Sequence, residues 1–483
     1  MKEFGRIPLL IIIGTLAVVI VIMLSTRHSR VPMPSSDNFC KVDMGEAHEI
    51  LIVAPHNDDE VLGPGGTVQN CLAEGTNVRV VMMTNGDGQW RGPFVSSKKN
   101  EIQLGYRRQR ETIKALANLG IPEKNVIFLG YPDRGLNVLW NSSWTCDNLY
   151  RSKRTGEDHT EYTDSYQPGA PYCGISVVQD LEKILKDNVP DIIYFPHPQD
   201  IHPDHWATNA FVTYALEKLR TENPTDEKLK KLREFTYLVH FWRWPLPRGK
   251  HLNDSLLPPK ELVELGTQWV KNDLAPDVTE NKLKSILQYK SQMEFMPRYL
   301  ESFARTDELF GILPPLRLNI SSTLSNYQSA PELLSGNESE TSPDTTPFLT
   351  YLDPIHRSIL SEIRRLNDIK SVDISGDERF LIITVDCLNK IKDSTNIMIH
   401  IKPLLPSGGN NSFMFELKEG KLLLNNEDFS NDSQFSFKVV DESFKLKVPM
   451  SFLGNPPKII LGAELLRKDI SFSKSAYRTI QLN

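Results

Sequence analysis

The sequence shows no excess of basic residues. It has 55 Lys and Arg against 61 Asp and Glu, a formal net charge of −6, and no basic stripe is visible. Because a protein that binds nucleic acid must neutralise phosphates with Lys and Arg, we expect no nucleic-acid partner. No internal repeat is evident either, so the sequence gives no sign of a repeat architecture.

Cysteine is also scarce. The chain has five cysteines, and an odd number means that they are not all paired with one another. Cys146 and Cys173 bracket an irregular polar insertion from Asn141 to Gly174, where a disulfide would fix the loop. Two unrelated thiols are the alternative, and so few cysteines neither establish nor exclude export.

One long apolar run is present, from Pro8 to Leu24, close to the lower limit of the roughly 17–25 residues that span a bilayer. Ser25 to His28 make a poor signal-peptide cleavage site, which predicts an uncleaved, single-pass membrane anchor. Basic residues flank the run on both sides, so the positive-inside rule does not predict its orientation in the membrane. Since the tail before the run is very short, we expect the tail to stay in the cytoplasm and the rest of the chain to lie outside it.

A chain of 483 residues exceeds what one hydrophobic core normally organises, so more than one unit is expected. Composition divides the chain into a membrane anchor, a polar stem, an α/β region, a linker rich in Ser, Thr, Asn, Pro and Glu, and a β-rich region. The bounds of these five parts are, in order, 1–30, 31–47, 48–316, 317–348 and 349–483.

Strands and helices alternate through the α/β region. Strands are expected near Glu49, Val78, Val126 and Asp191, and helices at Gly65–Glu74, Glu101–Leu119, Val177–Lys186 and Trp206–Arg220. This alternation predicts a mostly parallel, doubly wound (Rossmann-like) sheet with helices on both faces. Beyond the linker, a helix is expected at Ile355–Leu366, and the short apolar and alternating runs that follow predict a β-sandwich.

Two polar segments follow apolar runs of the α/β region. Pro55–Glu60 comes directly after Ile50–Ala54, and His202–His205 comes shortly after Ile192–Phe195. Because open α/β sheets place their ligand sites at the carboxyl ends of their strands, both segments are expected at one site. Imidazole and carboxylate ligands suit Zn²⁺, and three protein ligands leave a position for water, as in a catalytic zinc site.

Each residue of the two segments receives a predicted role. His56, Asp59 and His205 hold one zinc ion per chain, and Asp58 is the general base that takes a proton from zinc-bound water. His202 donates a hydrogen bond or proton to a developing oxyanion, and Asp204 supports an imidazole. The alternative for Asp58 or Asp59 is an N-cap of the following helix. His197 is interpreted as structural.

The sequence resembles the LmbE/PIG-L-type zinc-dependent N-deacetylases from about Glu49 to Met296. Pro55–Glu60 resembles the family's opening motif, with Asn57 in place of the usual proline, and His202–His205 matches its closing His-Pro-Asp-His. The resemblance implies the same metal ligands and base, and removal of acetyl groups from N-acetylglucosamine conjugates. It also implies that Arg108 and Asp133 contact the sugar, although a surface salt bridge is the alternative for Arg108.

The C-terminal β-rich region weakly resembles sugar-binding modules, and an accessory domain without a ligand is the alternative. We therefore expect a membrane-anchored, zinc-dependent N-deacetylase whose zinc-activated water attacks the amide of an N-acetylated sugar or conjugate. Two alternatives stay open: an amidase on a non-sugar acylated amine, and a non-catalytic sugar-binding surface protein. Asn57 favours the non-catalytic alternative, because the turn lacks the proline that stiffens it in the family motif.

Overall fold

The computed structural model describes residues 40–41, 47–88, 97–264, 267–320, 348–352, 367–430, 432–467 and 470–483. Pro8–Leu24, the predicted anchor, and Ile355–Leu366, the predicted helix, lie outside these residues. None of the helices within the described ranges is long and apolar enough to cross a membrane. Phe39–Asn483 form one compact unit, which contains the α/β region and the C-terminal β-rich region.

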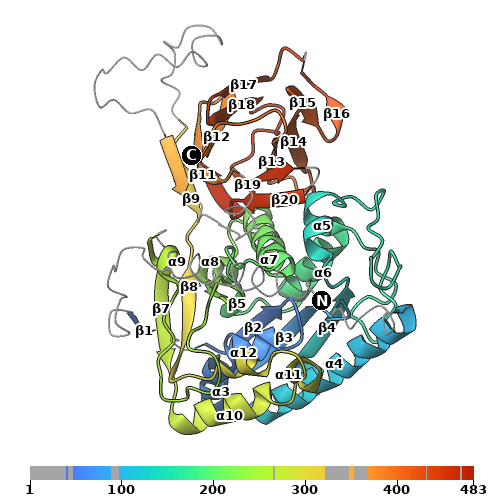
Figure 1. The fold of residues 1–483 in the computed structure, drawn as a ribbon, viewed down its shortest axis with the longest axis vertical. Helices are drawn as coiled ribbons and strands as arrows, with labels where there is room; N and C mark the ends of the chain where they lie inside the picture. The colour runs from blue at the N-terminus through green and yellow to red at the C-terminus, as the bar shows by residue number, and fades with distance from the viewer. Residues whose placement is uncertain are drawn as a thin grey trace, which may run out of the picture. The chain divides into compact units, whose positions relative to one another are not determined.

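An eight-stranded mixed sheet forms the centre of the α/β region (Figure 1). Its order is β1-β7-β8-β6-β5-β2-β3-β4. All neighbouring strands are parallel except at β8, which runs antiparallel to both β6 and β7. The strands are β1 (Cys40–Lys41), β2 (Glu49–Ala54), β3 (Asn77–Thr84), β4 (Val126–Tyr131), β5 (Ile192–Pro196), β6 (Arg233–Tyr237), β7 (Gln268–Asp273) and β8 (Asp307–Ile312).

Helices cover both faces of this sheet because its central strands are apolar on both sides. Ile50 and Ile52 of β2 belong to the core under α3, α4 and α10, whereas Leu51 and Val53 belong to the core under α5, α6 and α7. Figure 1 shows these two groups of helices on opposite sides of the strands. The helices are α2 (Asp59–Leu62), α3 (Gly65–Ala73), α4 (Lys98–Leu119), η2 (Glu123–Asn125), α5 (Leu136–Asn141), α6 (Gly174–Asp187), α7 (Pro203–Glu222), α8 (Glu227–Lys231), α9 (Lys260–Glu264), α10 (Pro276–Ile286), α11 (Lys290–Met293) and α12 (Pro297–Glu301).

The order of the parallel strands creates a switch point between β2 and β5. The chain passes from β2 outward through β3 to β4, and then returns to place β5 on the other side of β2. Doubly wound sheets bind their ligands at the carboxyl ends of the strands on either side of such a point. The two predicted polar segments follow β2 and β5.

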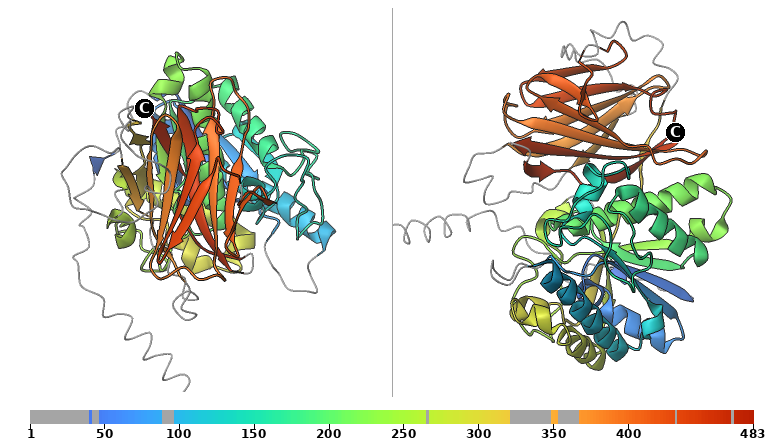
Figure 2. Two further views of the ribbon diagram at one scale, coloured as in Figure 1. Left: turned by 90° about the horizontal axis from the view of Figure 1, so that it is seen from above. Right: turned by 90° about the vertical axis from the view of Figure 1, so that its right-hand side faces the viewer.

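The C-terminal region packs two sheets around one apolar core (Figure 2). A five-stranded sheet has the order β10-β11-β12-β18-β17, and the second has the order β16-β15-β14-β13-β19-β21-β9, with β20 pairing with β19. The strands are β9 (Leu316–Leu318), β10 (Phe348–Leu352), β11 (Ile369–Gly376), β12 (Phe380–Cys387), β13 (Asn396–Leu404), β14 (Phe413–Lys418), β15 (Lys421–Leu424), β16 (Glu427–Asp428), β17 (Ser436–Val440), β18 (Ser443–Pro449), β19 (Lys458–Arg467), β20 (Ile470–Lys474) and β21 (Arg478–Leu482).

The mixed α/β sheet and the β-rich C-terminal region agree with the predicted fold class. Arg317 and Leu318, the first residues of the predicted linker, pair with β21, and Cys40–Lys41 in the predicted stem pair with β7. Backbone pairing of such short segments depends on partners far along the chain, which local composition does not reveal. The five predicted domain bounds stay a prediction.

The C-terminal region contacts the α/β region through aromatic side chains. Tyr477 packs its ring against those of Trp140 and Trp206, with centroids 5.3 and 5.5 Å apart, and its hydroxyl donates to Asn141 Oδ1 at 2.7 Å. Lys402 extends from β13 so that its ammonium lies 3.5 Å from the ring centroid of Trp144. Trp206 lies one position after the predicted ligand His205, so the C-terminal region packs on the helix, α7, that carries this ligand.

We expect Tyr477→Ala to destabilise the folded protein by about 3–5 kcal/mol, the usual cost of truncating a large buried aromatic side chain. Tyr477 is only 4% exposed, so its removal leaves a cavity between the two tryptophans. Chemical denaturation of the purified protein measures the change. Leu388→Ala, at a site 38% exposed, is the control and should change stability by no more than about 0.5 kcal/mol. Equal effects of the two variants would contradict the tight packing of this interface.

Candidate metal-dependent active site

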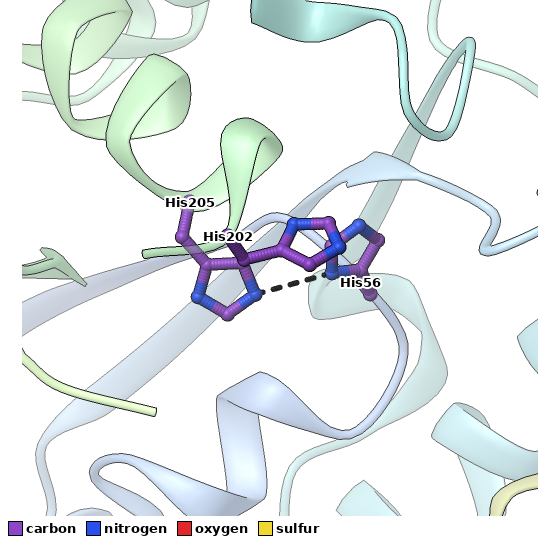
Figure 3. A group of neighbouring side chains, drawn as sticks. All are labelled: His56, His202 and His205. Atoms are coloured by element: carbon purple, nitrogen blue, oxygen red, sulfur yellow. Dashed lines mark hydrogen bonds between the residues drawn. The ribbon is translucent and has the colours of Figure 1, made fainter. Parts of the chain in front are cut away.

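Three side chains from two strand ends meet at one point. His56 and Asp59 lie on the turn from β2 into α2, and His205 lies in the first turn of α7. His56 Nδ1 is 3.3 Å from Asp59 Oδ2 and 3.2 Å from His205 Nε2, and His205 Nε2 is 3.1 Å from Asp59 Oδ2. Figure 3 shows the rings of His56 and His205 facing each other with His202 beside them. We call His56, Asp59 and His205 the ligand triad.

Carboxylates hold the outer nitrogens of both imidazoles of the ligand triad. His205 Nδ1 lies 3.1 Å from Asp200 Oδ2, and His56 Nε2 lies 3.1 Å from Asp204 Oδ2. These contacts favour protons on the outer nitrogens, so the two facing nitrogens present lone pairs. His56 Nδ1 and His205 Nε2 lie within hydrogen-bond distance of each other, so either a proton or a metal ion among the three donor atoms offsets the repulsion between lone pairs and the carboxylate oxygen. A tetrahedral zinc ion with bonds of about 2.0–2.1 Å spaces its ligands by about 3.3 Å, so the triad fits such an ion.

Asp58 lies beside the ligand triad in an unusual backbone conformation. It occupies the N-cap position of α2, but its side chain makes no capping hydrogen bond, and its φ is 137°. A residue other than glycine at such a φ is strained, and strain of this kind is concentrated at functional sites. Glu60 Oε2 accepts the Asp58 N–H at 2.9 Å and stabilises the turn. Burial and the negative charge of Asp59 raise the pKa of Asp58 well above its usual value.

His202 is the N-cap of α7. Its Nδ1 accepts the backbone N–H of Asp204 at 3.3 Å, so the neutral ring carries its hydrogen on Nε2 and can donate it. The His202 ring centroid is 4.7 Å from that of His56, and burial together with the neighbouring His56 lowers the pKa of His202. The carboxylate of Asp204 contacts His56 and accepts the N–H groups of Arg134 and Leu136.

Arg108 and Asp133 lie against the same turn. Arg108 is 4% exposed and donates to the carbonyl oxygens of Gly86 and Asn57, both at 2.8 Å, so it is not part of a surface salt bridge. Asp133 Oδ1 lies 3.4 Å from His56 Nε2, on the outer side of the ligand triad. A direct contact of either residue with a sugar stays a prediction.

Asn57 is fully buried, and its side chain is fixed in place of the missing proline. Its side-chain Nδ2 donates to Thr112 Oγ1 on α4 at 3.0 Å, and its backbone carbonyl oxygen accepts from Arg108. Hydrogen bonds from α4 therefore hold the turn that a proline ring would have stiffened. The substitution does not displace His56 or Asp59 from the ligand triad.

Sequence reasoning missed two residues of the site, Asp200 and His240. Asp200 is two positions before His202, and one of its oxygens accepts the backbone N–H groups of Val239 and His240. His240 follows β6, the strand next to β5, and one of its ring nitrogens lies near Asp59 and His205. A polar residue after a third parallel strand was the available signal for His240, by the reasoning used for β2 and β5.

Cys146 and Cys173 form a disulfide and are not two unrelated thiols. The disulfide closes the insertion between α5 and α6. Cys71 and Cys387 are free and buried. His197 is also buried; its Nδ1 accepts the N–H of Gln199, and its ring stacks on that of Trp269 at 5.3 Å.

Known proteins match the part of the chain that contains this site. A model of the PIG-L family, described as GlcNAc-PI de-N-acetylase, matches residues 51–216. A 1D-myo-inositol 2-acetamido-2-deoxy-alpha-D-glucopyranoside deacetylase of Mycobacterium sp. (strain KMS) is 30% identical over 253 residues, which cover 51% of this chain and 70% of that relative. The chain belongs to the PIG-L family. The family predicted from the sequence motifs is thereby confirmed.

Two further matches are weaker. The protein of the same name from Nocardioides sp. (strain ATCC BAA-499 / JS614) is 27% identical over 176 residues, 34% of this chain and 53% of that protein. Among solved structures, N,N'-diacetylchitobiose deacetylase from Pyrococcus horikoshii has 22% sequence identity and a TM-score of 0.35, and the match covers 56% of this chain and 85% of that one.

We expect Asp200→Asn to weaken metal binding by about 10- to 100-fold, the usual cost of removing a carboxylate that orients a metal-bound histidine. Asp200 is fully buried and lies against His205, so the neutral amide would no longer favour a proton on His205 Nδ1. Competition with a chelator measures the affinity. Asp187→Asn, an exposed position, is the control. An unchanged affinity in Asp200→Asn would contradict its orienting role.

Proposed function

We propose that this chain is a zinc-dependent hydrolase that removes the acetyl group from an N-acetylglucosamine-type sugar or conjugate. The observation that carries the proposal is the ligand triad, whose three donor atoms lie 3.1–3.3 Å apart, next to Asp58, whose Oδ2 lies 3.9 Å from Arg108 Nη2. Membership of the PIG-L family and the names of the matched relatives support the choice of an N-acetylated sugar substrate.

In this proposal His56, Asp59 and His205 hold one zinc ion per chain. When bound, the ion supplies positive charge that lowers the pKa of water to about 7 and polarises the amide carbonyl. Asp58 accepts the proton of the attacking water and passes it to the nitrogen of the leaving amine. The hydrogen on His202 Nε2 stabilises the negative charge that develops on the former carbonyl oxygen.

The surrounding carboxylates keep these groups in place. Asp200 and Asp204 fix the ring orientations of His205 and His56, and Asp204 is held in turn by backbone N–H groups after β4. Glu60 fixes the backbone of Asp58 and is itself the acceptor of the Tyr289 hydroxyl at 2.6 Å. Preorganised groups of this kind need no rearrangement when charge develops, which is how such sites accelerate hydrolysis.

Acetate release tests the proposal. The purified full-length chain, loaded with Zn²⁺, is assayed with an N-acetylglucosaminyl inositol, with N,N'-diacetylchitobiose and with an N-acetylated amine that lacks a sugar. We expect acetate from one or both sugar compounds and none after chelation. Turnover of the non-sugar amine alone would favour the amidase alternative, and no turnover of any compound by metal-loaded protein would favour a non-catalytic protein.

We further propose that Pro8–Leu24 anchors the chain in a membrane and that the catalytic region lies outside the cytoplasm. The apolar run supports the anchor, and the Cys146–Cys173 disulfide supports an oxidising compartment. Protease added to intact cells should therefore digest the catalytic region, while a cytoplasmic marker protein stays protected. Protection of the catalytic region until lysis would place it on the cytoplasmic side.

A further inference from the structure

His240 lies beside the ligand triad but outside every motif that the sequence offered. One of its ring nitrogens is within 4.8 Å of the donor atoms of Asp59 and His205. Its ring centroid lies 4.7 Å from that of His205 and 5.2 Å from that of His202. The side chain therefore lies next to the residues to which the reaction is assigned.

Tyr299 determines which nitrogen of His240 carries the hydrogen. The Tyr299 hydroxyl donates to the carbonyl oxygen of Val239 at 2.7 Å, so its own oxygen is left to accept from His240 Nδ1, 3.1 Å away. With the hydrogen on Nδ1, the neutral ring keeps a lone pair on Nε2. The Tyr299 ring also stacks on that of His240, with 13° between the planes, which fixes the orientation of the imidazole.

Asp200 links His240 to the ligand triad through the backbone. Its Oδ2 accepts the N–H of His240 at 2.8 Å and lies 3.1 Å from His205 Nδ1. Both ends of His240 are thus fixed, the backbone by Asp200 and the ring by Tyr299.

The hydrogen-bond partners distinguish His240 from the ligand triad. Donor atoms within the ligand triad are 3.1–3.3 Å apart. Within the described residues, His240 Nδ1 bonds to the Tyr299 hydroxyl and no hydrogen bond joins either ring nitrogen to the triad, although one of them lies within 4.8 Å of the donor atoms of Asp59 and His205. With a lone pair on Nε2, the ring can accept a hydrogen from a bound water, and the metal content of His240 variants distinguishes this role from that of a fourth ligand.

We propose that His240 positions the attacking water by accepting one of its hydrogens at Nε2. The inference rests on the proposed amide hydrolysis and adds a residue to it. Asp58 takes the other hydrogen as a proton while the water oxygen forms its bond to the amide carbon. The hydrogen bond to His240 breaks no covalent bond, and its ring ends the step in the state in which it began. His240 therefore controls the direction of attack and leaves proton transfer to Asp58.

His240→Ala and His240→Gln test this role in the full-length protein. We expect His240→Ala to lower kcat by about 10- to 100-fold, the usual range for residues that orient groups at a metal centre. KM for the sugar substrate, the zinc content, the chelator-competition affinity and the absorption spectrum of the Co²⁺-loaded protein should stay unchanged. His240→Gln should recover part of kcat because its amide oxygen is also an acceptor. Tyr299→Phe should lower kcat less than His240→Ala does, since it frees the ring without removing it.

His251→Ala is the matched control. His251 lies between β6 and α9, as His240 does, but it pairs with Asp254 and is not part of the site. Loss of zinc or a changed Co²⁺ spectrum in His240→Ala would make His240 a ligand and overturn the positioning role. Full activity in His240→Ala, or a change in KM alone, would also overturn it. If His240→Ala does not fold, His240→Gln and Tyr299→Phe decide by the same measurements. No turnover by the wild-type protein would refute the proposed hydrolysis itself, which is a separate outcome.

Discussion

His205→Ala is expected to reduce bound zinc from about one ion per chain to nearly none and to reduce deacetylation to background. His205 is fully buried and supplies one of the three donor atoms of the ligand triad, and two remaining ligands do not make a stable zinc site. His56→Ala and Asp59→Ala should have the same effect for the same reason. Metal analysis after gel filtration, together with the acetate assay, measures both losses.

His159→Ala is the control for these variants. His159, Glu157 and Glu161 form a half-buried group that could also hold a metal ion, so the control distinguishes adventitious binding there from binding at the buried triad. We expect His159→Ala to keep both zinc and turnover. Stoichiometric zinc retained in all three triad variants would contradict the assigned ligands.

The ligand triad could be predicted from the sequence because each of its segments follows a strongly apolar strand. Ile50–Ala54 and Ile192–Pro196 are buried throughout, and adjacent parallel strands bring their carboxyl ends together whatever the loops between them do. The distance of 149 residues between His56 and His205 is therefore no obstacle to prediction. The positions of the two polar segments after two apolar strands were enough to predict that His56 and His205 lie together.

Other parts of the site depend on contacts that no local pattern encodes. The tautomer of His240 follows from Tyr299, 59 residues later, and that of His205 from the orientation of the Asp200 side chain. The φ of Asp58 results from how β2 enters α2, and Asp residues occur at ordinary φ values far more often. Such details become visible only when the three-dimensional arrangement is known.

The C-terminal region illustrates the same limit at the level of domains. A β-sandwich was predicted from its short apolar and alternating runs, and the structure has two sheets around one apolar core there. Its packing on the α/β region was not predicted, because Tyr477, Trp140 and Trp206 carry no sign of the partners that they will meet. A weak resemblance to sugar-binding modules gave no reason to expect that this region would pack on α5 and α7.

Asp58→Asn is expected to keep zinc and the fold but to lower kcat by about 10²-fold or more, the effect of losing a positioned general base. The side chains have the same shape, and Asn tolerates positive φ values better than most residues, so the strained turn should persist. The Asp58 backbone N–H would still donate to Glu60. The side-chain amide of the variant, however, cannot accept a proton from water at neutral pH.

The separation of metal content from turnover is what distinguishes a base from a ligand. Loss of zinc in Asp58→Asn equal to that in Asp59→Ala would show that Asp58 coordinates the metal and that the roles of the two neighbouring aspartates are wrong. Asp147→Asn, an exposed position in the disulfide-bridged insertion, is the isosteric control and should keep both properties. Asp58 and Asp59 are adjacent and both buried, so their positions alone do not tell the ligand from the base. Zinc retained in Asp58→Asn and lost in Asp59→Ala would establish that Asp59 binds the ion and that Asp58 faces the attacking water.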